Sequence, residues 1–237
     1  METYSNVKVD SFPDFMEIIT KVDKNEILLF RGQSNDDSLL PMIARKNPRI
    51  DTVDLEIRML KDFSRRSNVF VQSTMKNDWD WLALGQHYGL STRLLDWTSN
   101  PLIALWFACN SKEIKGEFSV VWLFSVPDDS LLDIDKDPSP FSYGKTRVYQ
   151  PNLVGKRLST QLGWFTVHRY SRATEPNRFV GLERNPEQSG NLTKIVIPKD
   201  LRQEFIEKLD TCGVNSSTIY PELDGLCQHI NWLHLDS

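Results

Sequence analysis

The sequence predicts an α+β fold in a single domain, with a central mixed or antiparallel sheet and flanking helices. Strand-like and helix-like segments are interleaved irregularly, without the steady strand–helix alternation of a doubly wound sheet. The apolar run Phe118–Val126 has the composition of a central strand. At 237 residues, 40% of them hydrophobic, the chain is long enough to bury a full core. We expect a helical segment over residues 1–25 and a core over residues 26–237.

The first half of the chain contains patterns for three helices and one strand. A short helix is expected over residues 11–19, with Ser11 as its N-cap. Glu26–Gly32 has the pattern of a buried strand that ends in Arg-Gly. Asp51–Phe70 carries apolar residues at roughly helical spacing, and Trp79–His87 predicts a further helix that stops before a glycine.

The second half begins with Pro101–Asn110, which predicts a helix with proline at its start. This helix is apolar all round and should therefore be buried. Two polar stretches that contain prolines, residues 127–150 and 169–190, are expected to be loops. The remaining expected elements are strands over Leu158–His168 and Leu192–Pro198, an amphipathic helix over Lys199–Leu209, and a turn into a final helix over Asn215–Gly225.

Composition and charge narrow the class of protein. The net charge is −4 and the pI about 5.6, so the chain as a whole does not attract nucleic acid. No apolar run reaches the length of a membrane span, and the N-terminus lacks the pattern of a secretory signal. The three cysteines have neither metal-ligand nor disulfide spacing. We expect a cytoplasmic protein with no membrane association and no metal.

The most informative segment is Leu84–Pro101, where many polar residues lie between apolar ones. Each buried polar group without a partner costs on the order of 1–3 kcal/mol, so a core element would hold this many only if they were paired. Such a segment is typical of a binding site; the alternative is a buried polar network that fixes a loop. Tyr88 and Trp97 favour a binding site, because they suit stacking on a flat ring.

Arg31 is the second candidate feature. It ends a predicted strand and precedes Gly32, which lets another group approach the backbone closely. A guanidinium matches the geometry of a phosphate or a carboxylate. The alternative is a structural ion pair with an acid such as Glu56. Asp96 could pair with Arg31 or with Arg93.

Three further residues have two interpretations each. His87 could be a general base, a ligand-binding donor or a core histidine. Gln161 stands near Gly163 at the entrance of a predicted strand, where the glycine indicates a close approach of another group or a β-bulge. Glu222 could stabilise a cationic transition state or cap the last helix. Basic residues that could form a nucleic-acid face, or merely a solvated helix face, are Arg45, Lys46, Arg49, Arg58, Lys61, Arg65 and Arg66.

These motifs, in this order, resemble the FRG-domain family, which is named for its Phe-Arg-Gly motif. The resemblance covers most of the chain, and its central run is highly specific. The matching segments are Phe30–Gln33, Leu39–Pro41, Trp81–Leu84, Gln86–Gly89, Ser91–Trp97, Asn100–Pro101, Ile195–Pro198 and Tyr220–Gly225.

A second, weaker resemblance is to toxin-type ADP-ribosyltransferases, whose core is a split β-sandwich. Arg31 matches their strand-terminal arginine, and Ser91-Thr92 match two positions of their Ser-Thr-Ser motif. Ala104–Phe107 resembles the helix that follows. Arg93 replaces the third serine, and no Glu-x-Glu or Gln-x-Glu pair occurs on a later strand.

The resemblance implies a mono-ADP-ribosyltransferase of toxin or antiphage-defence type. NAD would be its substrate and a protein or nucleic acid its acceptor, and an antitoxin protein could neutralise it. The alternatives are an NAD glycohydrolase and a non-catalytic nucleotide-sensing module.

The resemblance also assigns roles to residues. Arg31 would hold the pyrophosphate, Ser91 or Thr92 the nicotinamide ribose, and Tyr88 or Trp97 the ring. The group near the ribose 2′-hydroxyl would be His87, Gln161 or Glu222. The remaining expected ligand contacts are Gly32, Gln33, Arg93 and Asp96.

Overall fold

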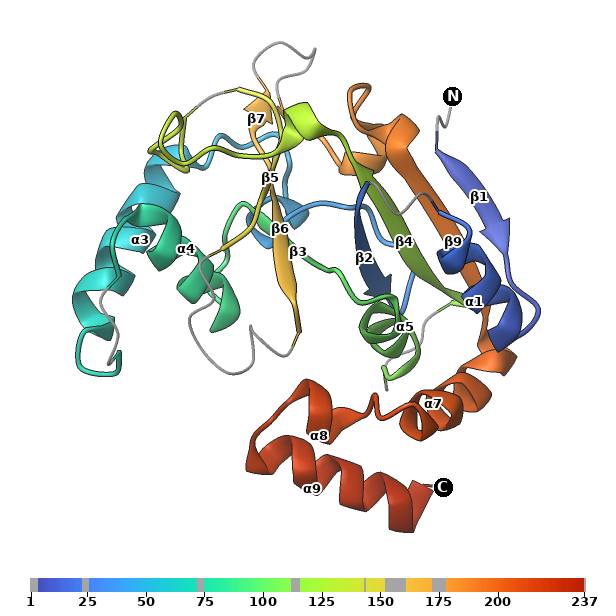
Figure 1. Ribbon diagram of the computed structural model, residues 1–237. Helices are drawn as coiled ribbons and strands as arrows, with labels where there is room; N and C mark the ends of the chain where they lie inside the picture. The colour runs from blue at the N-terminus through green and yellow to red at the C-terminus, as the bar shows by residue number, and fades with distance from the viewer. Residues whose placement is uncertain are drawn as a thin grey trace.

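The computed structural model describes residues 4–22, 26–71, 75–111, 116–142, 144–151, 161–171 and 178–236. A seven-stranded mixed sheet runs through the molecule (Figure 1). All neighbouring strands are antiparallel except the pair β1–β9, which confirms the expected α+β class. In spatial order the strands are β1 (Ser5–Lys8), β9 (Leu192–Pro198), β4 (Phe118–Val126), β2 (Ile27–Gln33), β3 (Leu94–Thr98), β6 (Gly163–Val167) and β5 (Arg147–Tyr149).

The sheet consists of two halves that meet at the middle. β2 pairs with β4 along its whole length, from Ile27 to Gln33. Between β2 and β3, by contrast, the described residues contain the single pair Phe30–Thr98. The half β1-β9-β4-β2 and the half β3-β6-β5 are therefore joined at one point, immediately before Arg31.

Helices α1 (Phe12–Thr20), α5 (Pro101–Cys109) and α7 (Arg202–Thr211) pack against the larger half of the sheet. The Ser11 side chain caps α1 as expected, by accepting a hydrogen bond from the Asp14 N–H. Asn100 caps α5 and leads it directly out of β3. α5 is apolar on nearly all sides, and its middle residues are fully buried, as the sequence predicts.

Helices α3 (Val53–Ser67) and α4 (Asp78–His87) cover the smaller half, β3-β6-β5 (Figure 1). Their core contains Trp79 and Phe165, which are almost fully buried. α4 ends at His87, so its C-terminus points its polar residues towards the junction of the two half-sheets.

The C-terminal helices α8 (Ser216–Ile219) and α9 (Leu223–Asn231) lie below α5 and α7 (Figure 1). Tyr220 contacts Trp106 of α5 edge to face, with ring centroids 5.8 Å apart. A Cβ on Gly225 would lie 2.0 Å from the Tyr220 carbonyl oxygen. The glycine therefore allows α9 to pack directly on the end of α8.

The shorter elements complete the chain. They are α2 (Met42–Arg45), the hairpin of β7 (Tyr170–Ser171) and β8 (Arg178–Phe179), the 3₁₀ turns Asp128–Ser130, Leu182–Arg184, Ser189–Asn191 and Lys199–Leu201, and a π-helical turn over Trp232–Asp236. Among the described residues, no helix has the length and apolar character needed to cross a bilayer.

The structure differs from the sequence-based expectation in four places. β3 lies inside the polar run, where no strand was expected; all its residues except Asp96 are buried, so the segment shows no two-residue alternation. β1 lies in the segment expected to be helical and adds to the sheet beside β9. The loop expected at 127–150 contains β5, and the loop expected at 169–190 contains β7 and β8. Residues 158–160 of an expected strand, and residues 143 and 172–177 of the two expected loops, lie outside the described residues.

Candidate functional site

Two cavities meet at the junction of the half-sheets, and both include Arg31, Gly32 and Phe107 in their walls. The smaller cavity has a volume of about 320 Å³ and lies between the ends of β2, β3, α4 and β6. The larger has a volume of about 820 Å³ and lies between β2, α5 and the α8–α9 pair. Ligand sites typically have volumes of about 300–1,000 Å³, so each cavity could hold part of a ligand.

Arg31 lies at the point where the two cavities meet, with its side chain only 14% exposed. Its Nη1 donates a hydrogen bond of 2.7 Å to the main-chain oxygen of Asp96, and its buried Nε has no partner among the described residues. The nearest carboxylate oxygen, Asp96 Oδ2, is 4.0 Å from Nη1. Burial lowers the pKa of Arg31 to about 10, but the side chain stays charged at neutral pH.

The carboxylate of Asp96 is held by a short chain of hydrogen bonds. Gln86 Nε2 donates to Asp96 Oδ2 over 2.9 Å. Thr92 Oγ1 in turn donates to Gln86 Oε1 over 2.7 Å, and it accepts from the Leu94 N–H over 3.0 Å. Residues from α4 and β3 thereby position one carboxylate beside Arg31.

Glu222 lies across the larger cavity from α2 and begins α9. It occupies the N-cap position of α9, as the alternative interpretation expected, although its side chain makes no capping hydrogen bond in the described structure. Asp37, Arg45 and Asp224 also line this cavity, which therefore contains charges of both signs.

Two of the expected ligand contacts next to Arg31 have structural roles instead. A Cβ on Gly32 would lie 1.8 Å from the Ala104 carbonyl oxygen, so the close approach that this glycine allows is that of helix α5. Gln33 is buried, and its Oε1 accepts a hydrogen bond from Trp122 Nε1 over 3.0 Å. Gly32 and Gln33 still border the larger cavity.

Arg93 is not beside the cavities. Its guanidinium forms a two-pronged ion pair with Glu56 on α3, over 2.8 and 3.0 Å, and both side chains are at most 2% exposed. Thr52 donates a further hydrogen bond to the same carboxylate. Glu56, which the sequence suggested as a partner for Arg31, is therefore the partner of Arg93, and the Arg93 side chain lines neither cavity.

Ser91, Thr92 and Tyr88 also line neither cavity. Ser91 and Thr92 lie between α4 and β3, and the residues of this polar run that line the smaller cavity are on those two elements: Gln86 and His87 on α4, and Asp96, Trp97 and Thr98 on β3. Thr92 acts indirectly through Gln86. Tyr88 is 74% exposed and contacts the His87 ring edge to face.

Trp97 borders the smaller cavity, but its ring is buried and unavailable for stacking on a ligand. The ring packs against Phe124, and its Nε1 donates to Thr166 Oγ1 over 3.1 Å. Aromatic residues whose rings are only partly buried, Phe107 and Trp164, line the same cavity. They are better placed to contact a planar group.

His87 and Gln161 both line the smaller cavity. Gln161 accepts a hydrogen bond from Thr98 Oγ1 at its main-chain oxygen, over 2.7 Å. The structure therefore brings together Arg31, His87, Asp96 and Gln161, which are separated by up to 130 positions in the sequence, whereas Glu222 lines only the larger cavity.

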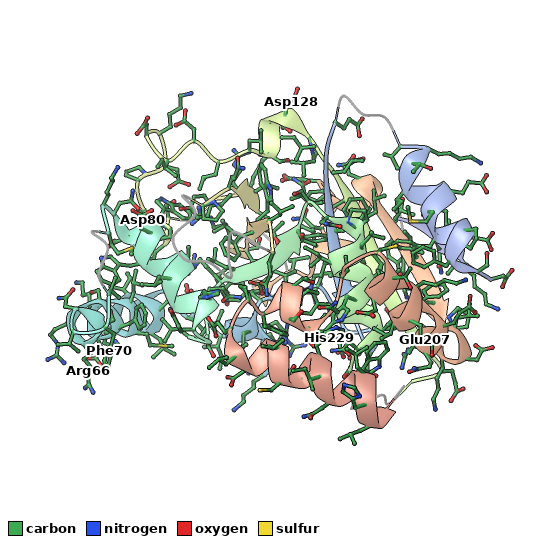
Figure 2. All side chains as sticks on the ribbon, turned by 60° about the horizontal axis from the view of Figure 1, so that its bottom comes forward. Arg66, Phe70, Asp80, Asp128, Glu207 and His229 are labelled. Carbon is green, nitrogen blue, oxygen red and sulfur yellow. The ribbon has the colours of Figure 1, made fainter. Side chains whose placement is uncertain are left out.

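Sequence reasoning missed Gln86, Thr98, Phe107 and Trp164 as residues that line the smaller cavity. Gln86 and Thr98 belong to the polar run that the sequence singled out. Which residues of that run line a cavity depends on where α4 ends and where β3 begins. Of the expected basic face, Arg45 alone borders either cavity. Arg65 and Arg66 pair with Asp62 at the far end of α3 (Figure 2).

The part of the chain that the structure describes contains no cluster of side chains that could bind a metal ion. No group of three or more histidine, cysteine, aspartate or glutamate side chains there could hold an ion. The cavities offer instead one buried cation, one positioned carboxylate and several hydrogen-bonding amides and hydroxyls.

Comparison with known protein families identifies a match over part of the chain. Residues 26–117 match the family model described as the FRG domain. This segment contains β2, β3, α4 and α5, which supply most of the smaller cavity. The match supports the FRG part of the expected resemblance. No curated protein and no solved structure matches the chain.

Proposed function

We propose that the chain is a mono-ADP-ribosyltransferase that binds NAD across the two cavities and transfers ADP-ribose to a protein or nucleic acid. The observation that supports this most is Arg31: a buried cation, with an unpartnered Nε among the described residues, at the junction of two cavities. NAD carries its two phosphates in the middle and a nucleoside at each end. An anion site flanked by two cavities matches that distribution of charge.

The residues that line the two cavities indicate how the dinucleotide would lie. The smaller cavity has a carboxylate and the half-buried rings of Phe107 and Trp164, and would take the nicotinamide riboside. The larger cavity would take the adenosine, beside Arg45 and the start of α9. The weaker resemblance to ADP-ribosyltransferases rests on Arg31, which lies two residues before the end of β2 and directly after the single pair of described residues that joins β2 to β3.

The first experiment tests the role of Arg31. Arg31→Met keeps much of the aliphatic stem and removes all the N–H donors, and Arg31→Ala removes both. We expect both variants to remain folded by circular dichroism and to lose NAD binding at least tenfold, because the lost charge-assisted hydrogen bonds are worth about 1.5–3 kcal/mol. Arg58→Ala, an exposed arginine on α3, is the control. Unchanged NAD binding by the folded Arg31→Met protein would refute the proposal.

The second experiment identifies the reaction. Purified protein is incubated with labelled NAD and a cell lysate, which is then separated into protein and nucleic-acid fractions. Label in one fraction, absent with Arg31→Met, supports transfer and identifies the acceptor class. Free nicotinamide without labelled macromolecules indicates an NAD glycohydrolase. NAD binding without turnover indicates a nucleotide-sensing module.

A further inference from the structure

Asp96 is the only acidic residue among the described residues that line the smaller cavity. Glu222, the acid expected from the sequence, lines the larger cavity. On the proposed function, the nicotinamide–ribose bond lies in the smaller cavity, so the carboxylate nearest to the reaction would come from β3 and not from the C-terminal helices.

The hydrogen-bond chain fixes the orientation of this carboxylate. Thr92 is buried, and because its oxygen accepts from the Leu94 N–H, its hydroxyl proton can be donated to Gln86 Oε1. Gln86 then presents its NH₂ group to Asp96 Oδ2. The amide of Gln86 is therefore oriented by a buried residue, and it orients Asp96 in turn.

Arg31 leaves the carboxylate available to a ligand. Its hydrogen bond goes to the main-chain oxygen of Asp96, and the 4.0 Å between Nη1 and Oδ2 is too long for a hydrogen bond. The Asp96 side chain is 58% exposed, in contrast to the buried carboxylate of Glu56. Asp96 thus has a fixed position and unused acceptor capacity facing the cavity.

We infer that Asp96 is a catalytic residue, whose carboxylate stabilises the ribosyl cation formed from NAD, and that Gln86 is the residue that positions it. This inference rests on the proposed function. The C1′–N1 bond breaks and its electron pair leaves with the nicotinamide nitrogen, so neutral nicotinamide departs. C1′ becomes part of an oxocarbenium ion. The acceptor then attacks C1′ and releases its proton to solvent.

The physical basis is electrostatic. The positive charge of NAD moves from the nicotinamide ring to the ribose as the bond breaks, and a fixed carboxylate beside the ribose interacts more strongly with that transition state than with the substrate. Asp96 can also accept a hydrogen bond from a ribose hydroxyl. Gln86 keeps the carboxylate in place, so that no reorientation is needed during the reaction.

The test uses Asp96→Asn, which keeps an oxygen to accept from Gln86 and removes only the charge. We expect kcat for nicotinamide release to fall by about 10²–10³-fold, as for loss of one transition-state-stabilising group. Binding of carba-NAD, an analogue without the ribose ring oxygen, should change less than about threefold. Asp96→Glu, which restores the charge, should recover part of kcat. Gln86→Leu should lower kcat roughly tenfold and leave KM within about threefold.

Asp128→Asn is the control, because this exposed aspartate lines neither cavity, lies at the edge of the molecule in Figure 2, and should retain wild-type kcat. A folded Asp96→Asn protein with kcat within threefold of wild type overturns the inference and leaves the proposed function intact. So does loss of kcat in Glu222→Gln but not in Asp96→Asn. A wild-type protein that binds carba-NAD but releases no nicotinamide from NAD overturns the proposed function, and the inference with it.

Discussion

At the level of single residues, the neighbours Arg31 and Gly32 show how adjacent positions serve different purposes. Arg31 faces the cavities, where its charge is only partly compensated. Gly32 lies under α5, where there is no room for a side chain. These consecutive residues of β2 thus have different roles: Arg31 serves the proposed chemistry, and Gly32 allows α5 to pack on the strand.

Gly32→Ala should destabilise the protein strongly. The added Cβ would lie 1.8 Å from the Ala104 oxygen and 2.7 Å from the Ala108 nitrogen, both backbone atoms that cannot move without displacing α5. We expect the free energy of unfolding to fall by about 3 kcal/mol or more. Urea denaturation measures this, with Gly190→Ala as a control because no atom lies within 4 Å of its added Cβ. Equal stability of the two variants would contradict the packing argument.

At the level of elements, α3 is joined to β3 by a buried ion pair, Arg93–Glu56, that the sequence suggested for a different arginine. Because Arg93 directly precedes β3, this pair also fixes the start of the strand that carries Asp96. The ion pair thus supports the smaller cavity without contributing to its wall.

Glu56→Gln should destabilise the protein by about 3–5 kcal/mol, because it leaves the Arg93 charge buried without a carboxylate. The matched control is Lys136→Gln, which removes an exposed ion pair with Asp133 and should leave stability unchanged. Chemical denaturation of both variants provides the measurement. The role assigned to the buried pair is wrong if Glu56→Gln unfolds at the same urea concentration as the control.

At the level of the whole molecule, the core of the smaller half-sheet contains buried polar groups that include a histidine. A hydrogen-bond chain runs from Trp97 Nε1 to Thr166 Oγ1 and on to His168 Nε2, with distances of 3.1 Å at each step. All three residues are buried. Thr166 Oγ1 accepts from Trp97 Nε1, and the tautomer of the His168 ring decides which atom donates in the Thr166–His168 hydrogen bond.

His168 should make stability depend on pH. Burial lowers its pKa from 6.5 to about 4, so the unfolded chain binds a proton below pH 6.5 while the folded protein does not until about pH 4. Stability should therefore fall as pH drops through this window, by about 3 kcal/mol in total from this residue. Urea denaturation at pH 7, 5.5 and 4.5 measures the slope.

Variants identify the residue responsible for that slope. His168→Gln lacks the titrating group, so its stability should depend less steeply on pH than that of the wild type, whatever its stability at pH 7. His234→Gln, at an exposed histidine in the C-terminal π-helical turn, should keep the wild-type slope. Identical slopes in all three proteins would refute the assignment to His168.

Much of the fold could be predicted from the sequence, because its strongest signals are local. The apolar runs of β4 and β9 gave the bounds that the structure has, and the Ser11 cap and the proline at the start of α5 marked helix starts correctly. β3 was missed because its segment shows no two-residue alternation, and β1 and β5 because they are short edge strands stabilised by their neighbours.

By itself the sequence determined the α+β class, most helices and the segment that would contain the candidate site. These depend on periodicity, capping and the cost of unpaired polar groups, all of which are local properties. Only the tertiary structure decided which polar residue meets which: Arg93 pairs with Glu56, and Arg31 bonds to Asp96. The physical reason is that the register of a strand decides towards which face each of its side chains points. That register depends on partner strands that are distant in the chain.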